Sequence, residues 1–577
     1  MTRRADWLVA AALLVMATVA LQLASRELGF TRDEGYYFQA AEQHVAYLEE
    51  ALDGLRHGKP LAFADRRVID HWLSYNSEHP PLMKTLFGIS WRLLHRCDCP
   101  NEAGLHPIAY PQRHRTLGLL KQGDAMRLPA HLLTGALVAA VYLFGTLAFG
   151  RPAGLVGALL TLLQPRLFFH SQLSCFDAPV AAMIFIITAA YLRLHLRPSR
   201  GWAVAFGVLL GLGLLTKHNT FFLPPVLLVH SLWSRRQRIA GWAEMSGRQK
   251  AAALASWIVA PWTLPAALLA PAVYFAGWPH LWPAPIARFG NYVGFHLHHV
   301  HYNIEYLGVN YNKPPYPWHY VPVMTALTAP VTMLLLAMLG LLALRRLQKE
   351  RSLSGLVLLS IAWPMLVIMR PGTPIFGAEK HWLPAMPFVA LLAGVGFASV
   401  CGRVAALLSR RALALAPLLL GVAVLTPALL EVAGSLPYGL SYYNALAGGT
   451  AGAADLGMNR QFWGYSVRGL MPTLNQLAPP GAAIYFHDAN WPLLQMSMKD
   501  GLLRRDLRDS GIEEPGVRAA QLGLVIHEKH FNKYEYWLWD AFGTTRPSAV
   551  LTHEGVPLVT LYSRPGLPPP PPQPATR

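Results

Sequence analysis

Charged residues are scarce in this sequence. Asp, Glu, Lys and Arg together make up 14% of the 577 residues, whereas a soluble domain usually carries about 25%. Hydrophobic residues reach 53%, and the mean hydropathy is +0.30. These values exclude a single large water-soluble globule, and they also exclude a disordered chain.

Cysteine is scarce as well. The four cysteines, Cys97, Cys99, Cys175 and Cys401, are too few for a disulfide scaffold and lack the paired spacing of a zinc ribbon. Cys97 and Cys99 are too close in sequence for an unstrained mutual disulfide. We expect idle thiols, with partners elsewhere or a metal as alternatives.

Nucleotide-binding loops are absent. The sequence has neither Gly-x4-Gly-Lys-Ser/Thr nor a Gly-x-Gly-x-x-Gly that follows a strand. Lys and Arg number 49 against 31 Asp and Glu, which gives a net charge of +18. Such an excess can indicate a nucleic-acid partner, but long apolar runs favour basic residues at the cytoplasmic ends of membrane helices. No nucleic-acid partner is expected.

Long apolar runs predict about eleven transmembrane helices, since a bilayer needs roughly 20 apolar residues per span. Residues 7–24 read as an uncleaved anchor rather than a signal peptide, because no good cleavage site follows. The two stretches within 202–233 are short and can form one broken hairpin. The candidates are 7–24, 128–148, 153–173, 178–195, 202–215, 219–233, 251–275, 321–343, 353–369, 382–400 and 412–433.

The loops between these runs predict the orientation. With the N-terminus in the cytoplasm, every predicted cytoplasmic loop is basic, which is the positive-inside pattern. These loops are 149–152, 196–201, 234–250, 344–352 and 401–411. We therefore expect a multi-pass protein of the inner (cytoplasmic) membrane with three extracytoplasmic parts: residues 25–127, residues 276–320 and everything after about 434.

The first outer loop carries two adjacent acids, Asp33 and Glu34, where the first span emerges. The apolar spacing that follows, to about residue 55, predicts an amphipathic helix in the membrane interface, with Glu42 on its polar face. A second, shorter apolar stretch, to Leu94, predicts another interfacial helix. A carboxylate at such a place can take a proton from an alcohol or amine, and nearby cations can neutralise a departing phosphate. Alternatively, Asp33 caps the helix and Glu34 pairs with Arg32.

An ordered set of motifs resembles the membrane glycosyltransferases of the C superfamily, in particular the protein O-mannosyltransferase and lipid A aminoarabinose transferase group. Each motif is weak alone, but their order and sidedness are similar along nearly the whole chain. The motifs are Asp33-Glu34, His79-Pro80-Pro81-Leu82, Arg127-Leu128-Pro129, Phe149–Gly154, Asp177-Ala178-Pro179, Thr216-Lys217, Tyr306-Leu307-Gly308, Pro317–Tyr320, Lys380–Pro387 and Tyr442–Thr450.

The resemblance implies a fold and an activity. The fold is an all-α polytopic membrane domain, here residues 1–433, with an extracytoplasmic α/β domain over 434–564 and a Pro-rich tail over 565–577. The activity is transfer of a hexose or pentose from a polyprenyl-phosphate sugar to an extracytoplasmic protein hydroxyl, glycolipid or glycan, with inversion at the sugar carbon. The long segment 95–127, which contains Cys97 and Cys99, departs from the family pattern and puts the acceptor surface in doubt.

The resemblance also implies residue roles. Asp33 would be the general base, Glu34 would orient it, and Asp177 would lie at the active site. Asp177 can instead be the N-cap of the next helix. Glu78 and His79 would bind the sugar, with a solvated polar loop as the alternative. Cations for the phosphate are sought among Lys84, Arg127, Lys217, Arg288 and Lys380, each of which can instead snorkel to headgroups; His319 and His381 complete the predicted substrate-binding set.

The segment with His296, His298, His299 and His301 offers a divalent-metal site, because closely spaced His side chains can share a metal. The alternative is an aromatic, hydrogen-bonded substrate loop. No cofactor is required beyond the lipid-linked sugar, which is a substrate.

The C-terminal part predicts strands at 483–486, 522–526, 549–551 and 558–562. His487-Asp488 and His527-Glu528 end two of them, and we expect ordinary surface pairs there. Competing functions for the whole chain are a polytopic transporter or lipid flippase, and a noncatalytic relative that only binds the lipid-sugar. Transporters place ionisable residues near the membrane midplane, whereas the acids here lie at outer helix ends.

Overall fold

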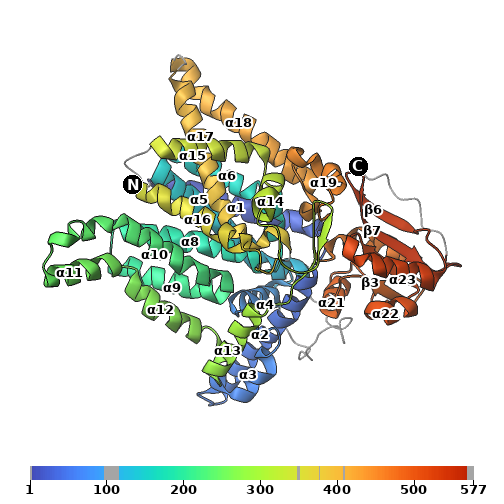
Figure 1. Ribbon diagram of the computed structural model, residues 1–577. Helices are drawn as coiled ribbons and strands as arrows, with labels where there is room; N and C mark the ends of the chain where they lie inside the picture. The colour runs from blue at the N-terminus through green and yellow to red at the C-terminus, as the bar shows by residue number, and fades with distance from the viewer. Residues whose placement is uncertain (1–2, 97–115, 347–350, 376, 407–409, 568–577) are drawn as a thin grey trace.

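Apolar helices build most of the molecule (Figure 1). This computed structural model describes residues 3–96, 116–346, 351–375, 377–406 and 410–567; Cys97 and Cys99 lie outside that range. Six helices of the described chain are long and apolar enough to cross a membrane. They are α1 (Arg4–Ala24), α5 (Gln122–Phe149), α8 (Asp177–Leu196), α16 (Arg351–Met369), α17 (Met386–Ala405) and α18 (Arg410–Ser435).

Three further spans are bent. The chain breaks by 68° between α6 (Arg151–Leu162) and α7 (Pro165–Ser171) and by 45° between α11 (Gly247–Ile258) and α12 (Thr263–Ala276). It breaks by 118° between α14 (Tyr320–Thr328) and α15 (Val331–Arg346). Pro165, Pro261 and Pro330 stand at these breaks, where proline lacks the N–H that would continue the helix.

The all-α membrane fold predicted from these apolar runs is confirmed, and fewer than eleven of the runs meet the length and composition of a separate span. All eleven stretches contain helix, but the described chain has six candidate spans, or up to nine if each bent pair counts as one. The two stretches within 202–233 form α9 (Arg200–Thr216) and α10 (Leu223–Ser234), joined by the 3₁₀ turn η3 (His218–Phe222), and α9 is shorter than a full span. Hydropathy alone does not detect where a helix bends.

Helix α17 lies at the centre of the bundle, between α6 and α15, and all of its first twelve residues are buried. Glycines allow the approach: a Cβ on Gly394 would stand 2.2 Å from the Ala153 carbonyl oxygen, and one on Gly396 would stand 2.0 Å from that of Leu336. Small residues bring membrane helices together in this way. The result is a rigid support for the segment that precedes α17.

Residues 25–96 form α2 (Arg32–Arg56), α3 (Arg66–Leu73) and α4 (Leu82–Leu94), so the two helices predicted in this segment are present. Later in the chain, α13 (Pro285–Leu297) and a small hairpin of β1 (Ile304–Tyr306) and β2 (Val309–Tyr311) follow. Glu42 of α2 is not on an exposed face as predicted, because it is 1% exposed and pairs with Lys499. Tertiary packing covers both faces of α2.

The C-terminal part is an α/β unit (Figure 1, orange to red). Its sheet has the order β4-β3-β5-β7-β6, with β3 parallel to β4 and β5 and the remaining pairs antiparallel. The four predicted strands are confirmed, and only the two-residue β4 was missed. The strands are β3 (Ala483–Phe486), β4 (Arg508–Asp509), β5 (Leu522–Ile526), β6 (Ala549–His553) and β7 (Val556–Ser563), and the main helices are α21 (Trp491–Lys499), α22 (Glu513–Ala519) and α23 (Asn532–Phe542).

Buried polar contacts attach this unit to the helical body. Lys499, at the end of α21, donates to Glu42 of α2 at 2.8 Å, and each side chain is 2% exposed. Asp500 accepts hydrogen bonds from the backbone N–H groups of Gln122 and Gly123 at 2.8 and 3.1 Å. These are among the free donors at the start of α5, so the C-terminal unit caps a membrane helix.

Candidate active site

Asp33 lies in the first turn of α2, at the edge of the helical body. The turn is fixed by a capping box, in which the side chain of Thr31 accepts from Glu34 N–H and the Glu34 carboxylate accepts from Thr31 N–H. Thr31 is thus the N-cap, and Asp33 is left free of that role. Its carboxylate lies 3.7 Å from Lys380 Nζ and keeps 20% of its surface exposed.

Lys380 comes from the 3₁₀ turn η8 (Ala378–His381), just before α17. Its side chain is only 4% exposed, and its ammonium lies 4.4 Å from the centre of the Trp463 ring. Burial lowers the pKa of Lys380, and the carboxylates of Asp33 and Asp177 both oppose that shift. The Lys380 ammonium therefore interacts electrostatically with both predicted catalytic carboxylates, Asp33 and Asp177.

Asp177 is the first residue of α8, and Phe176 rather than Asp177 occupies the N-cap position. Its carboxylate accepts from Lys217 Nζ at 2.6 Å, with the two side chains 5% and 12% exposed. Together with Asp33 and Lys380, these residues form the acid–lysine cluster. All four were candidates from the sequence, and the structure brings them together.

Glu34 and Arg127 are also paired, but as a buried clamp. Arg127 donates to both Glu34 carboxylate oxygens, at 2.7 and 2.8 Å, and its other N–H groups reach the carbonyls of Ser25, Leu28 and Gly29. All five donors of the guanidinium are thereby used. Arg127 holds the chain that leads into α2, and Glu34 pairs with it rather than with Arg32.

The loop before α4 is organised by Lys84. Its ammonium is buried and donates to the carbonyls of Asn76 and His79 at 2.7 and 2.8 Å. Glu78 accepts from the Asn76 amide at 2.8 Å, so these polar groups shape one turn. The ring of His79 faces Tyr37 at 5.7 Å between centres.

Tyr37 is a site residue that the sequence did not single out. Its pKa is raised well above the usual value by burial and, in addition, by Asp33, Cys175, Asp177 and Glu78. The phenol therefore lies among the predicted acids. An aromatic residue on the apolar face of an amphipathic helix looks like a core residue, so its sequence pattern gave no signal.

The remaining predicted residues make other contacts. Arg288 pairs with Asp70 and donates to the His280 carbonyl at 2.7 Å. The ring of His319 contacts the Tyr306 hydroxyl at 2.7 Å.

The predicted histidine group does not converge. The ring of His296 lies tilted against that of His218, with 4.1 Å between the ring centres, and contacts the Glu78 carbonyl. His298 and His299 contact backbone carbonyls. The ring of His301 lies 6.3 Å from that of Tyr316. Across the described ranges, no three His, Cys, Asp or Glu side chains are placed to hold a metal ion.

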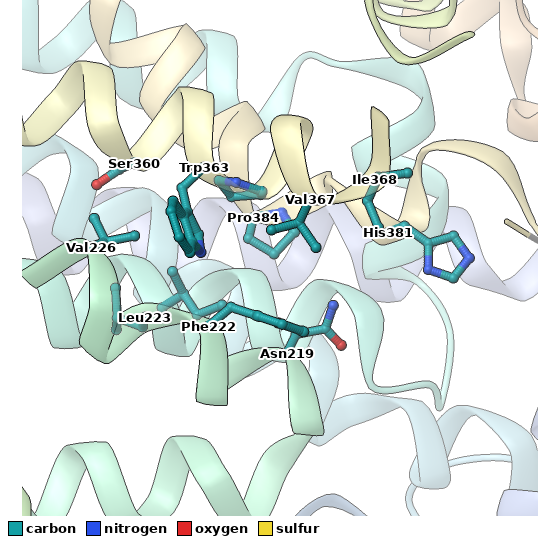
Figure 2. A pocket seen from close by; sticks show the side chains of 12 residues that line it. Asn219, Phe222, Leu223, Val226, Ser360, Trp363, Val367, Ile368, His381 and Pro384 are labelled. Atoms are coloured by element: carbon teal, nitrogen blue, oxygen red, sulfur yellow. The ribbon is translucent and has the colours of Figure 1, made fainter. Parts of the chain in front are cut away.

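An apolar cavity opens beside the acid–lysine cluster. It contains about 490 Å³ of empty space between α8, α10, α16 and the segment before α17. Figure 2 shows Trp363, Phe222 and Leu223 along its length, with Asn219 and His381 as polar groups at one end. Asn219 is two residues from Lys217 and His381 directly follows Lys380, so the segments that carry the two lysines also form this end of the cavity.

Comparison with known proteins supports the family resemblance. Residues 116–264 match the model of the dolichyl-phosphate-mannose-protein mannosyltransferase family. ArnT from Cupriavidus metallidurans bound to undecaprenyl phosphate superposes with a TM-score of 0.50 at 15% identity, over 97% of this chain and 98% of that one. The apo oligosaccharyltransferase from Archaeoglobus fulgidus matches with a TM-score of 0.47 at 12% identity, over 93% of this chain and 72% of that one.

No curated protein matches the chain significantly in sequence. The protein is a multi-pass membrane protein whose fold is that of ArnT over nearly its full length. Its sequence resembles the dolichyl-phosphate-mannose-protein mannosyltransferase family over residues 116–264, within the group that its motifs predicted, and its fold is similar to that of ArnT.

Proposed function

We propose that this protein is a glycosyltransferase that moves a sugar from a polyprenyl-phosphate donor to an extracytoplasmic acceptor. The observation that carries the proposal is the contact between Asp33 and Lys380, which lie 3.7 Å apart. The residue after Lys380, His381, lines the apolar cavity. A carboxylate that accepts a proton and a cation that neutralises a phosphate are the two groups this transfer needs.

The apolar cavity suits part of the isoprenoid chain, since its lining is mostly apolar with a few polar groups at one end, as in ligand pockets where such groups fix orientation. The phosphate would then lie near Lys217 and Lys380. Asp177 holds Lys217 in place through the 2.6 Å contact. A lysine ammonium acts as a point charge on phosphate oxygens.

In the transfer, an acceptor hydroxyl or amine attacks the anomeric carbon as its proton passes to Asp33. The bond between that carbon and the phosphate oxygen breaks, and polyprenyl phosphate leaves with the electron pair. One displacement inverts the sugar carbon and needs no covalent intermediate. Asp33 suits the role of base because its carboxylate remains partly exposed, whereas Glu34 is fully buried in the Arg127 clamp.

The finer assignments are also proposals. We place the protein in the inner membrane with its N-terminus in the cytoplasm and the C-terminal unit outside, on the strength of the basic loops. The transferred sugar is a hexose or pentose. The acceptor is a protein hydroxyl, a glycolipid or a cell-wall glycan.

The test is turnover by purified protein in nanodiscs with polyprenyl-phosphate sugars and an envelope extract as acceptor. Polyprenyl phosphate should be released only when acceptor is present. Asp33→Asn should lower that release by about 100- to 10,000-fold, the usual contribution of a general base. Asp53→Asn is the matched control, because Asp53 lies on the same helix and its side chain is 63% exposed. Unchanged release by Asp33→Asn would refute the mechanism.

A further inference from the structure

A second cavity lies where the helical body meets the C-terminal unit. It encloses about 580 Å³ of empty space, including space open to solvent. We call it the joint cavity. It is lined by Arg32, Tyr302, Asn303, Ile304, Tyr320, Gly377, Ala378, Asn459, Phe462, Trp463, Asp488, Glu528 and Phe531.

Two strand ends supply its acids. Asp488 follows β3 and Glu528 follows β5, and these neighbouring strands are parallel, so their carboxyl ends lie at the same edge of the sheet. Ligands of α/β sheets bind at such edges. The expectation of surface pairs was wrong for these acids, because the Asp488 side chain and Glu528 are each only 7% exposed.

The joint cavity lies next to Asp33, the proposed base. Arg32, which lines it, directly precedes Asp33 and donates to Asp488 at 2.6 Å. Trp463 also lines it and lies beneath the ammonium of Lys380, which in turn contacts Asp33. A ligand in the joint cavity would therefore lie one side chain away from the proposed base.

The turn η8 runs between the two cavities. Its first residue, Ala378, lines the joint cavity, and its last, His381, lines the apolar cavity. Lys380 stands between them and contacts Asp33. An inverting displacement needs the nucleophile and the leaving group on opposite faces of the sugar ring, and two cavities separated by this turn provide those two places.

The backbone around the joint cavity adopts conformations that side chains rarely allow. Ala378, Trp463 and Asp488 have φ angles of +48°, +72° and +58°, and all three line the cavity. Non-glycine residues with positive φ are uncommon and cluster at ligand sites, where the surrounding structure holds them. Packing therefore fixes the shape of this cavity at some cost in stability.

Among the described residues that line the joint cavity, the one cationic side chain is part of an ion pair. The Arg32 guanidinium is already paired with Asp488, which disfavours a phosphate ligand. Burial raises the pKa of Glu528 well above its usual range, with Asp488 and Glu305 adding to the shift. The side-chain amides of Asn303 and Asn459 can both donate and accept hydrogen bonds, and they line the cavity beside the aromatic rings of Tyr302, Phe462 and Trp463.

We infer that the joint cavity binds the acceptor, and that this acceptor is an uncharged saccharide rather than a polypeptide segment. Neutral groups that both donate and accept suit hydroxyl groups, and aromatic faces suit the C–H faces of a sugar ring. The inference rests on the proposed function, and it names a glycolipid or cell-wall glycan as the acceptor class.

The test uses the full-length protein in nanodiscs with uncharged disaccharides, namely diacetylchitobiose, mannobiose and cellobiose. A peptide containing Ser and Thr is added as a competing probe. Saturation-transfer NMR should detect binding of at least one disaccharide to the wild type and to Asp33→Asn. Trp463→Ala and Glu528→Leu should each weaken that binding by about tenfold or more, as removal of a central pocket contact does. Tyr536→Ala is the matched control, because Tyr536 is an exposed aromatic residue of the same unit.

Undecaprenyl phosphate binding is measured on the same samples. Binding of the peptide but no disaccharide, or of no probe sugar at all, overturns the saccharide assignment, as does disaccharide binding that both cavity variants leave unchanged. Glu528→Leu keeps the test decisive if Trp463→Ala does not fold. If the wild type does not bind undecaprenyl phosphate, the result counts against the proposed function itself.

Discussion

The guanidinium of Arg127 grips the Glu34 carboxylate through two hydrogen bonds of 2.7 and 2.8 Å, and neither side chain exceeds 1% exposure. Ser174 N–H also donates to this carboxylate at 2.9 Å. The clamp thus joins the start of α2 to α5 and to the loop before α8. It fixes the two segments that carry Asp33 and Asp177.

Breaking this clamp should cost stability. Glu34→Gln leaves Arg127 buried without its counter-charge, and removing one partner of a buried ion pair typically costs about 3–5 kcal/mol. The midpoint of unfolding in detergent should fall accordingly. Glu514→Gln is the control, because Glu514 pairs with Arg518 on the surface, where an ion pair contributes about 0–1 kcal/mol. Equal stability of the two variants would show that the clamp is not structural.

Lys380→Gln should lower turnover more than it lowers stability. The variant removes the ammonium that lies 3.7 Å from Asp33, so both the leaving phosphate and the base lose a charged neighbour. A loss of about 100-fold or more in kcat is expected for one electrostatic contact at the reacting centre. Initial rates with polyprenyl-phosphate sugar measure it, and the exposed Lys313→Gln serves as control. A change confined to acceptor KM would contradict this role.

How far the sequence anticipated this site depended on the distance between partners. Asp33, Asp177, Lys217 and Lys380 were found because each stands in a short local motif at a helix end. The pairing of Arg32 with Asp488 was not, because 456 residues separate them. Trp463 was not predicted, because a buried aromatic residue that lines a cavity has the same sequence pattern as one in a hydrophobic core.

The same limit applied to the fold. Strands β3 and β5 were predicted to the residue, because short apolar runs between turn residues define them locally. Hydropathy windows run across the bends at Pro165, Pro261 and Pro330, so the sequence did not show that three of the predicted spans are bent. The two short stretches within 202–233 account for the difference between eleven predicted spans and nine candidate spans. The sequence also did not reveal that Glu42 would meet Lys499 in a buried interface, since that contact depends on docking of the C-terminal unit.

Orientation can be tested with a single introduced thiol. Asp506 lies in the C-terminal unit with its side chain 43% exposed, so Asp506→Cys should react with a membrane-impermeant maleimide in intact spheroplasts. The wild type, which keeps its own cysteines, sets the background. Labelling that requires membrane permeabilisation would place this unit, and Asp33 with it, on the cytoplasmic side.

Stability should rise with pH through Lys84. Burial lowers the pKa of this ammonium to about 7, with Glu78 opposing the shift, whereas an unfolded lysine titrates near 10.4. Between these values the unfolded chain binds more protons than the folded one, so this group's contribution to the free energy of unfolding increases with pH. The increase is at most about 1.4 kcal/mol per pH unit. Below pH 7 both states are protonated, and the contribution stays constant at its least favourable value.

The measurement compares wild type with Lys84→Met, because the difference between the two curves isolates this group from other titrating residues. Unfolding in detergent is followed from pH 6 to pH 10. The free energy of unfolding of the wild type, relative to that of Lys84→Met, should be lowest below pH 7. It should increase as the pH rises from 7 to 10. Parallel curves would show that Lys84 titrates like an exposed lysine and that its contacts with the carbonyls of Asn76 and His79 do not bury its charge.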